Sequence, residues 1–116
     1  MDEQWKVRYD AIQARVQAAI PKPCHVIFSA YKETPEGWPL DNLDEVAVEG
    51  KACFIDDISD VPYRSAVVDN PTWLTVAKLA NEMILATEDL HHIFLEAVSE
   101  EEVVDGVKIV EFVMGS

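Results

Sequence analysis

Apolar residues recur at helical spacing near the start of the chain. Within residues 3–20 they form one stripe, made up of Trp5, Tyr9, Ile12, Val16 and Ala19 or Ile20. Residues three and four apart lie on the same face of a helix, so the pattern predicts an amphipathic helix. Asp2 is placed to cap its first turn, and Pro21 and Pro23 end it because proline lacks an amide donor.

A second helix is predicted after Asn70-Pro71, because asparagine is a good cap and proline is favoured at the first helical position. The apolar positions that follow keep the spacing of three and four: Trp73, Val76, Ala77, Ala80, Met83 and Ile84. Leu74, Leu79 and Leu85 widen the apolar side. We expect this helix to be covered by a sheet and also by the first helix or a second subunit.

Segments rich in β-branched and aromatic residues predict strands at 24–31, 46–56, 91–98 and 106–114. The first is apolar on both faces and is expected inside the sheet. Gly50 is expected to interrupt the second with a bulge or a turn. Asp105-Gly106 predicts a tight hairpin because both residues tolerate positive φ. The segments 32–45 and 57–69 are expected to be mostly irregular, with a short strand at 65–68.

The predicted fold is a single α+β domain over residues 1–116, with the order α-β-β-α-β-β. The short joins between strands favour a mainly antiparallel sheet of about four or five strands, with two helices packed on one face in a two-layer sandwich. The length of 116 residues and the apolar fraction of 49% fit one folded core.

The chain is strongly acidic, with 22 Asp and Glu against 9 Lys and Arg and a formal charge of −13. Its cations are scattered, which excludes direct binding of nucleic acid and disfavours an anionic membrane. A basic protein partner would be attracted, although acidity also serves solubility alone. With no basic leader and no run of about 18 apolar residues, we expect the cytoplasm and reduced thiols.

His91 and His92 stand side by side where a strand is expected. Neighbouring strand residues point to opposite faces, so the two imidazoles should not converge on one metal ion. Glu96 would share a face with His92, but at roughly 13 Å along a strand it is too far to touch. One histidine is expected to face solvent and the other to hydrogen-bond near the end of the second helix.

Cys24 and Cys53 would lie opposite each other if 24–31 and 46–56 formed a hairpin. A thiol pair near His25 could hold zinc, but His25 would point to the other face. Small buried cysteines are also common core residues. We therefore expect no metal and no cofactor here.

Acidic clusters at 41–45 and 56–60 raise the question of a divalent cation. The EF-hand frame fails in the second cluster, because Ile58 and Val61 stand where an acid and a glycine are needed. Nucleophile and phosphate-binding motifs are absent, since the glycines are dispersed and no Gly-x-Ser-x-Gly occurs. Solvated acidic loops are the expected outcome.

Two loops carry residues typical of protein interfaces. Trp38 and Pro39 lie in one, and Tyr63 and Arg64 lie in the other. A loop tryptophan either folds back onto the core, which is the commoner outcome, or waits for a partner as a binding hot spot. These four residues are the candidate partner contacts.

Acidity, small size and helix–strand order are loosely similar to those of secretion-chaperone-like adaptors. The likeness rests on element order, and the last helix of those adaptors has no counterpart here. It implies a homodimer. The leading hypothesis is an acidic, non-catalytic adaptor, inhibitor or chaperone-like domain that binds a protein, including by DNA mimicry. The alternative is a small enzyme or ligand-binding domain, with a site between helices and sheet that uses His25, His91 or His92 with nearby acids such as Glu96.

Overall fold

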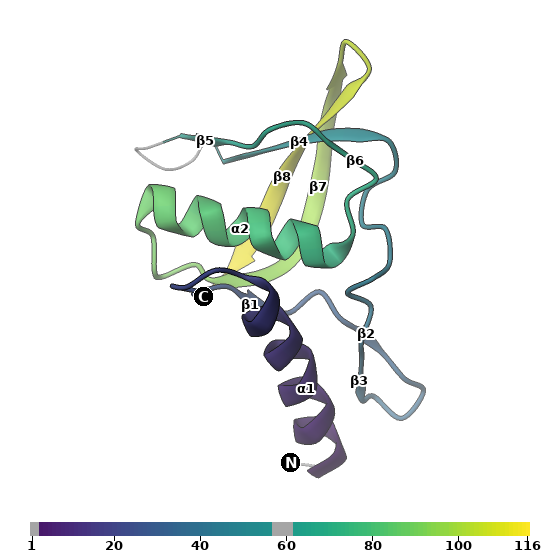
Figure 1. The fold of residues 1–116 in the computed structure, drawn as a ribbon. Coiled ribbons are helices and arrows are strands. Elements are labelled where there is room, and N and C mark those ends of the chain that lie inside the picture. The colour runs from purple at the N-terminus through teal and green to yellow at the C-terminus, as the bar shows by residue number, and fades with distance from the viewer. Residues whose placement is uncertain (1–2, 57–61) are drawn as a thin grey trace.

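The computed structural model describes residues 3–56 and 62–116 and has an α+β fold (Figure 1). In chain order its elements are α1 (Glu3–Ala19), β1 (Ile27–Phe28), β2 (Lys32–Glu33), β3 (Pro39–Leu40), β4 (Lys51–Asp56), β5 (Tyr63–Arg64), β6 (Val68–Asp69), α2 (Trp73–Thr87), β7 (Phe94–Val104) and β8 (Val107–Gly115). None of these described helices is both long enough and apolar enough to cross a membrane.

The main sheet is mixed, with three antiparallel and two parallel pairings among its described strands, so the expected sheet is confirmed only in part. The order of elements also departs from the expected α-β-β-α-β-β. Its six described strands follow the order β1-β7-β8-β4-β5, and β6 also pairs with β4. The β7–β8 hairpin is antiparallel, but β1 runs parallel to β7 and β4 runs parallel to β8. The parallel pairs arise because α2 carries the chain across the sheet between β6 and β7.

The first predicted strand is much shorter than expected and lies at the edge of the sheet. Only Ile27 and Phe28 pair with β7. The prediction of an interior strand is therefore wrong. Both faces of this segment are apolar because it is enclosed by helices, with Val26 and Phe28 fully buried in the core cluster that α1 and α2 share.

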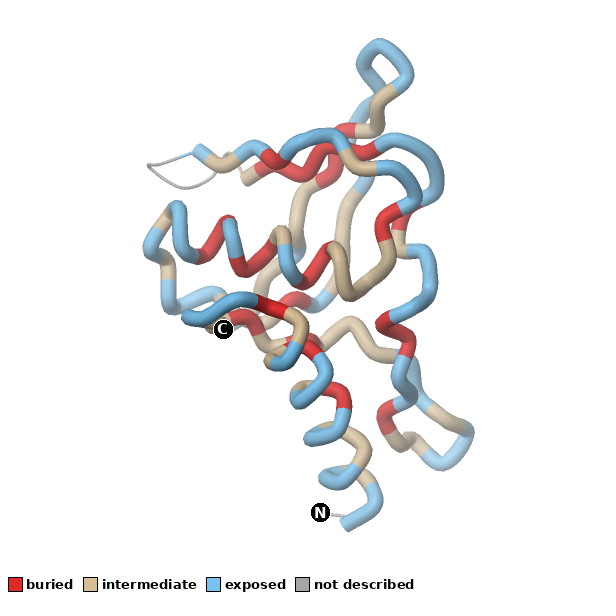
Figure 2. Tube along the Cα trace, viewed as in Figure 1, coloured by how far each residue is buried: buried red, intermediate tan, exposed pale blue. Residues whose placement is uncertain are grey.

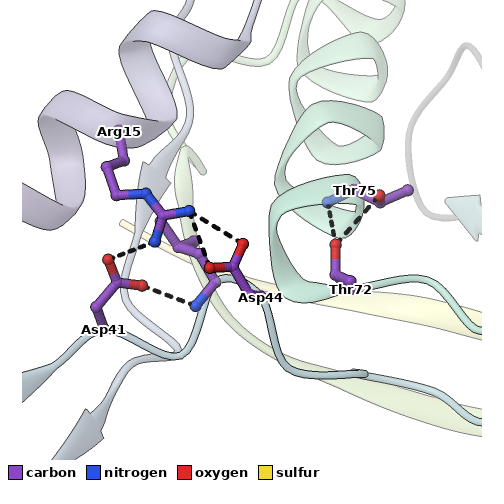
Figure 3. Close-up of polar contacts among 6 residues, drawn as sticks. Arg15, Asp41, Asp44, Thr72 and Thr75 are labelled. Carbon is purple, nitrogen blue, oxygen red and sulfur yellow. Dashed lines mark hydrogen bonds and ion pairs between the residues drawn. The ribbon is translucent and has the colours of Figure 1, made fainter.

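The start of α2 differs from the prediction by two residues. Thr72 is the N-cap, and its hydroxyl accepts a hydrogen bond from Thr75 N at 3.3 Å (Figure 3). Asn70 instead adopts a left-handed φ of 47°, and its side chain accepts a hydrogen bond from Gly50 N at 2.6 Å. The end of α1 at Ala19 agrees with the prediction, while the proposed Asp2 cap lies outside the described residues.

The turn predicted at Asp105-Gly106 is confirmed, whereas the strand predicted at 46–56 starts only after Gly50 and is not interrupted by it. Gly50 has a φ of 81° and directly precedes β4. Asp105 and Gly106 have φ values of 52° and 79°, which matches a tight turn between antiparallel strands. The hairpin is longer than expected, because β7 continues to Val104, and its tip projects beyond the rest of the molecule (Figure 1).

The core lies between α2 and one face of the sheet. Residues of α2 pack there against Phe28, Phe54, Leu95 and Val110, all fully buried. Figure 2 shows buried segments on both α2 and the strands. Helix α1 adds Ile12 and Val16 to the same core, but it packs against β1, β3 and α2 rather than lying flat on the sheet. The other face of the sheet holds a smaller cluster of Cys53, Ile55 and Ile109 with Val107 beside it.

Candidate functional site

Trp38 is held against α1 rather than extended into solvent. It follows Gly37, whose φ is 85°, in the turn between β2 and β3. The Arg8 guanidinium lies 5.1 Å from the centre of the Trp38 ring, in cation–π geometry. The Trp38 amide donates to Thr34 Oγ1 at 3.1 Å. The half-buried indole therefore has an intramolecular role in joining this turn to α1.

Pro39 is buried below 2% exposure, so on the isolated chain it offers no surface to a partner. It lies in β3, which packs against α1. The neighbouring Leu40 is the exposed apolar residue of this hairpin, with 43% of its surface accessible.

Tyr63 and Arg64 point to opposite faces of the sheet. The Tyr63 hydroxyl donates to Glu82 Oε2 of α2 at 2.9 Å, and its ring centre lies 6.2 Å from that of Phe112. Burial, followed by this hydrogen bond, raises the pKa of Tyr63. Arg64 pairs with Ile55 and is exposed on the face away from α2. Figure 1 shows β5 and the β2–β3 hairpin far apart, so the candidate contacts do not form one surface.

The two adjacent histidines precede β7 instead of lying in it, which corrects the predicted strand boundary. His91 and His92 are exposed, and β7 begins at Phe94. Asp89 Oδ1 accepts a hydrogen bond from His91 N at 3.0 Å, and Asp89 Oδ2 lies 2.9 Å from His92 Nδ1. The expected contact near the end of α2 is thus made by His92. Asp89 turns the chain here, and this turn replaces the predicted extended backbone.

Glu96 is the extra residue of a bulge in β7. The register shifts between Leu95 and Ala97, and the exposed Glu96 side chain lies over Gly115. The predicted alignment of Glu96 with His92 on one strand face is therefore wrong, since His92 is outside the strand.

His25 lies two residues before Ile27, the first residue of β1, and His92 lies two residues before Phe94, the first residue of β7. Ile27 and Phe94 are partners in the parallel pairing. The two segments thus approach the same end of the sheet. The backbone amides of His25 and Val26 donate to Asn81 Oδ1, at 2.8 and 3.3 Å. Within the described ranges 3–56 and 62–116, no group of three or more His, Cys, Asp and Glu side chains is arranged to hold a metal ion.

The predicted pairing of Cys24 with Cys53 does not form. β7 and β8 lie between β1 and β4, which excludes a hairpin of 24–31 with 46–56. The intervening chain forms the separate β2–β3 hairpin instead. Both thiols are free; Cys53 is buried, and burial raises the pKa of the half-buried Cys24 thiol.

Carboxylates of the acidic loop 41–45 form ion pairs with basic side chains of the same chain. Arg15 reaches Asp41 Oδ2 at 2.6 Å and Asp44 Oδ1 at 3.0 Å (Figure 3). Lys32 lies 2.6 Å from Glu45. These carboxylates therefore tie α1 and β2 to the loop. In the cluster 56–60, all but Asp56 lies outside the described residues.

Two buried or half-buried amide side chains organise the fold and were missed from the sequence. Asn81, in α2, also donates to Pro23 O at 3.1 Å and so holds the segment before β1 against the helix. Gln13, in α1, forms hydrogen bonds to both the N and the O of Phe28. A polar residue within a helical apolar pattern was the available signal, but the sequence does not say what it meets.

The end of the β7–β8 hairpin gathers acidic residues that were not singled out from the sequence. Glu100, Glu101, Glu102 and Asp105 are all exposed there. Lys108 lies 3.3 Å from Glu100 and is the one basic residue of the hairpin. Val103 and Val104 at the tip are also exposed, at 64% and 47%. The hairpin is therefore a projecting surface that is both acidic and apolar.

Comparisons of this chain with protein families, with characterised proteins and with solved structures gave no match. Function is therefore inferred from the residues of the chain itself.

Proposed function

We propose that this chain is an acidic, non-catalytic protein-binding domain, an adaptor or inhibitor, whose partner presents lysine and arginine side chains. The observation that carries the proposal is the β7–β8 hairpin, which extends away from the core and exposes Glu100, Glu101, Glu102 and Asp105. A projecting acidic element attracts a basic partner over a distance and leaves room for it to dock.

The hairpin supports this function better than the loops predicted from the sequence. Trp38 and Tyr63 each have partners within the chain, Arg8 and Glu82 respectively. Both side chains are half-buried, so each has only part of its surface left for a partner. Of the candidate contacts, Arg64 stays on the surface, but its charge would repel a basic partner.

The proposal is tested with the tagged chain as bait in a lysate of the native host. Proteins retained by the unmodified chain are compared with those retained by the double variant Glu101→Gln/Glu102→Gln. The matched control is Glu33→Gln/Glu36→Gln, which removes the same charge from exposed positions on the β2–β3 hairpin. We expect the hairpin variant alone to lose the partner, and binding to weaken steeply as salt is raised.

Equal loss in both double variants would show that general acidity, and not this hairpin, attracts the protein. Retention that is insensitive to salt would contradict the electrostatic basis of the proposal. The expected homodimer and the cytoplasmic location stay predictions, and light scattering tests the first.

A further inference from the structure

The strand β7 has a neighbour on only one side along most of its length. β8 pairs with it as far as Val104, whereas β1 pairs with Phe94 and Leu95 alone. Among the residues that the structure describes, no strand and no backbone hydrogen bond covers the other side of 96–104. Backbone N–H and C=O groups alternate along that side and face outward.

The other edges of the main sheet are short, or the chain itself covers them in part. At β1, the Gln13 side chain takes up both the N and the O of Phe28. Beside β4, the strands β5 and β6 pair in turn, and between them Ser65 N donates to Phe54 O at 2.8 Å while Ser65 Oγ accepts from Phe54 N. Among the described strands, β7 therefore has the longest unpaired edge, since β5 and β6 have two residues each and β8 lacks a partner on its β4 side only beyond Glu111.

The charge along this edge determines which kind of strand can pair with it. Glu96, Glu100, Glu101 and Glu102 lie along it, with bulges at Glu96 and Glu101. Acidic residues and bulges on an edge strand oppose pairing with a second copy, because like charges directly opposite each other are destabilising. The same carboxylates would face lysine or arginine favourably on a strand of opposite charge.

We propose that the edge of β7 between Ala97 and Val104 takes up an extended lysine- or arginine-rich segment of the partner protein as an added strand. This inference rests on the proposed function and adds the conformation in which the basic partner is recognised. Main-chain hydrogen bonds supply affinity, and the glutamates select a basic segment over an acidic one. The exposed Val103 and Val104 supply apolar contacts at the tip.

The first test uses synthetic peptides of about ten residues, the length of the open edge with a margin. One peptide alternates lysine and valine. A second replaces lysine by glutamate. Two further peptides keep the lysines but carry N-methyl groups on alternate backbone amides. In one, the methylated amides lie along one edge of the extended peptide, and in the other they lie along the opposite edge. Binding to the full chain is measured by fluorescence anisotropy.

We expect the lysine–valine peptide to bind and the glutamate peptide not to bind. Of the two methylated peptides, the one whose donors face β7 should bind at least about tenfold more weakly, because each lost backbone hydrogen bond costs affinity. The other should bind normally. Glu101→Gln/Glu102→Gln should weaken the parent peptide, and Glu33→Gln/Glu36→Gln should not.

Amide hydrogen exchange gives a second readout that needs no variant. On addition of the lysine–valine peptide, alternate amides between Ala97 and Val104 should become protected, because they gain a strand partner. Protection of the same amides by raising the protein concentration without peptide would make a second copy the occupant, and would overturn the proposal.

Equal binding of the parent peptide and both methylated peptides would overturn the proposal of an added strand. The proposal of an acidic protein-binding hairpin would remain in place. Absence of peptide binding would also overturn the proposal of an added strand. The lysate experiment then tests the proposed function separately.

Discussion

The side-chain amide of Gln13 makes the two hydrogen bonds that a neighbouring strand would make with Phe28. Gln13 Oε1 accepts from Phe28 N at 3.0 Å, and Gln13 Nε2 donates to Phe28 O at 2.7 Å. A residue of α1 thus substitutes for a strand at the edge of the sheet. Because backbone groups left unpaired inside a protein are costly, this contact fixes where α1 packs.

Replacing Gln13 by leucine should lower the free energy of unfolding by about 1–3 kcal/mol, since Phe28 N and O lose their partners in a half-buried position. Urea denaturation measures the change. The control is Gln17→Leu, because Gln17 accepts only an exposed hydrogen bond from Lys22 and its loss should cost less than about 0.5 kcal/mol. Equal losses would contradict the role given to Gln13.

Asn81→Ala should be more destabilising than Asn42→Ala, although both asparagines are buried. Asn81 bonds the chain before β1 at three atoms, whereas Asn42 donates one hydrogen bond to Ala30 O. We expect losses of about 3 and about 1 kcal/mol respectively, from the number of groups left unsatisfied. Thermal and urea unfolding of both variants check the order, and a reversed order would refute the reasoning.

Trp38 and Arg8 should be energetically coupled. A double-mutant cycle of Trp38→Ala and Arg8→Ala should give a coupling of about 0.5–1 kcal/mol, as expected for a cation–π contact that is partly exposed. Additive losses would mean that the 5.1 Å contact contributes nothing. Trp38→Ala should lower the melting temperature and leave capture of the partner intact, because the proposed binding surface is the β7–β8 hairpin.

Asp89 should make stability depend on acid pH. Its pKa is lowered first by the hydrogen bond with His92 and then by that from His91 N. A carboxyl with a lowered folded-state pKa stabilises the protein above its unfolded pKa, and this contribution is lost as pH falls through the folded value. The stability difference between the unmodified chain and Asp89→Asn should therefore be largest near neutral pH and shrink below the ordinary value of 3.8. Melting temperatures measured across that range provide the check.

The variant His92→Ala serves as the control for this pH dependence. Without the imidazole, the largest cause of the lowered Asp89 pKa is gone. Replacing Asp89 in that background should then have a smaller effect at neutral pH. An undiminished effect would assign the stabilisation to the turn bond with His91 N alone.

Local signals in the sequence predicted the elements whose limits are set locally. Pro21 ends α1, and Asp105-Gly106 forms its turn, through their own backbone preferences and without contacts from elsewhere in the fold. The limits of β1 and β7 were not predictable in this way. Only two residues of β1 find a partner strand, and the start of β7 is delayed by a turn that Asp89 forms with His91.

The candidate site depended on information that a single sequence does not hold. Glu100–Glu102 appear along the chain as an ordinary acidic run, and solvation alone would explain such a run. Their significance comes from β7 being uncovered on one side, and this follows from strand order. Trp38 was an obvious candidate from its loop position, yet its interaction with Arg8 is made across the fold.

The position of β8 in the sheet determines when the sheet can form during synthesis. β8 (Val107–Gly115) follows the other described strands along the chain, yet it lies between β7 and β4 and joins them. A chain that lacks these residues has no strand between β7 and β4. The sheet therefore closes only after β8 has been made, and until then the apolar side of α2 lacks part of the surface on which it packs.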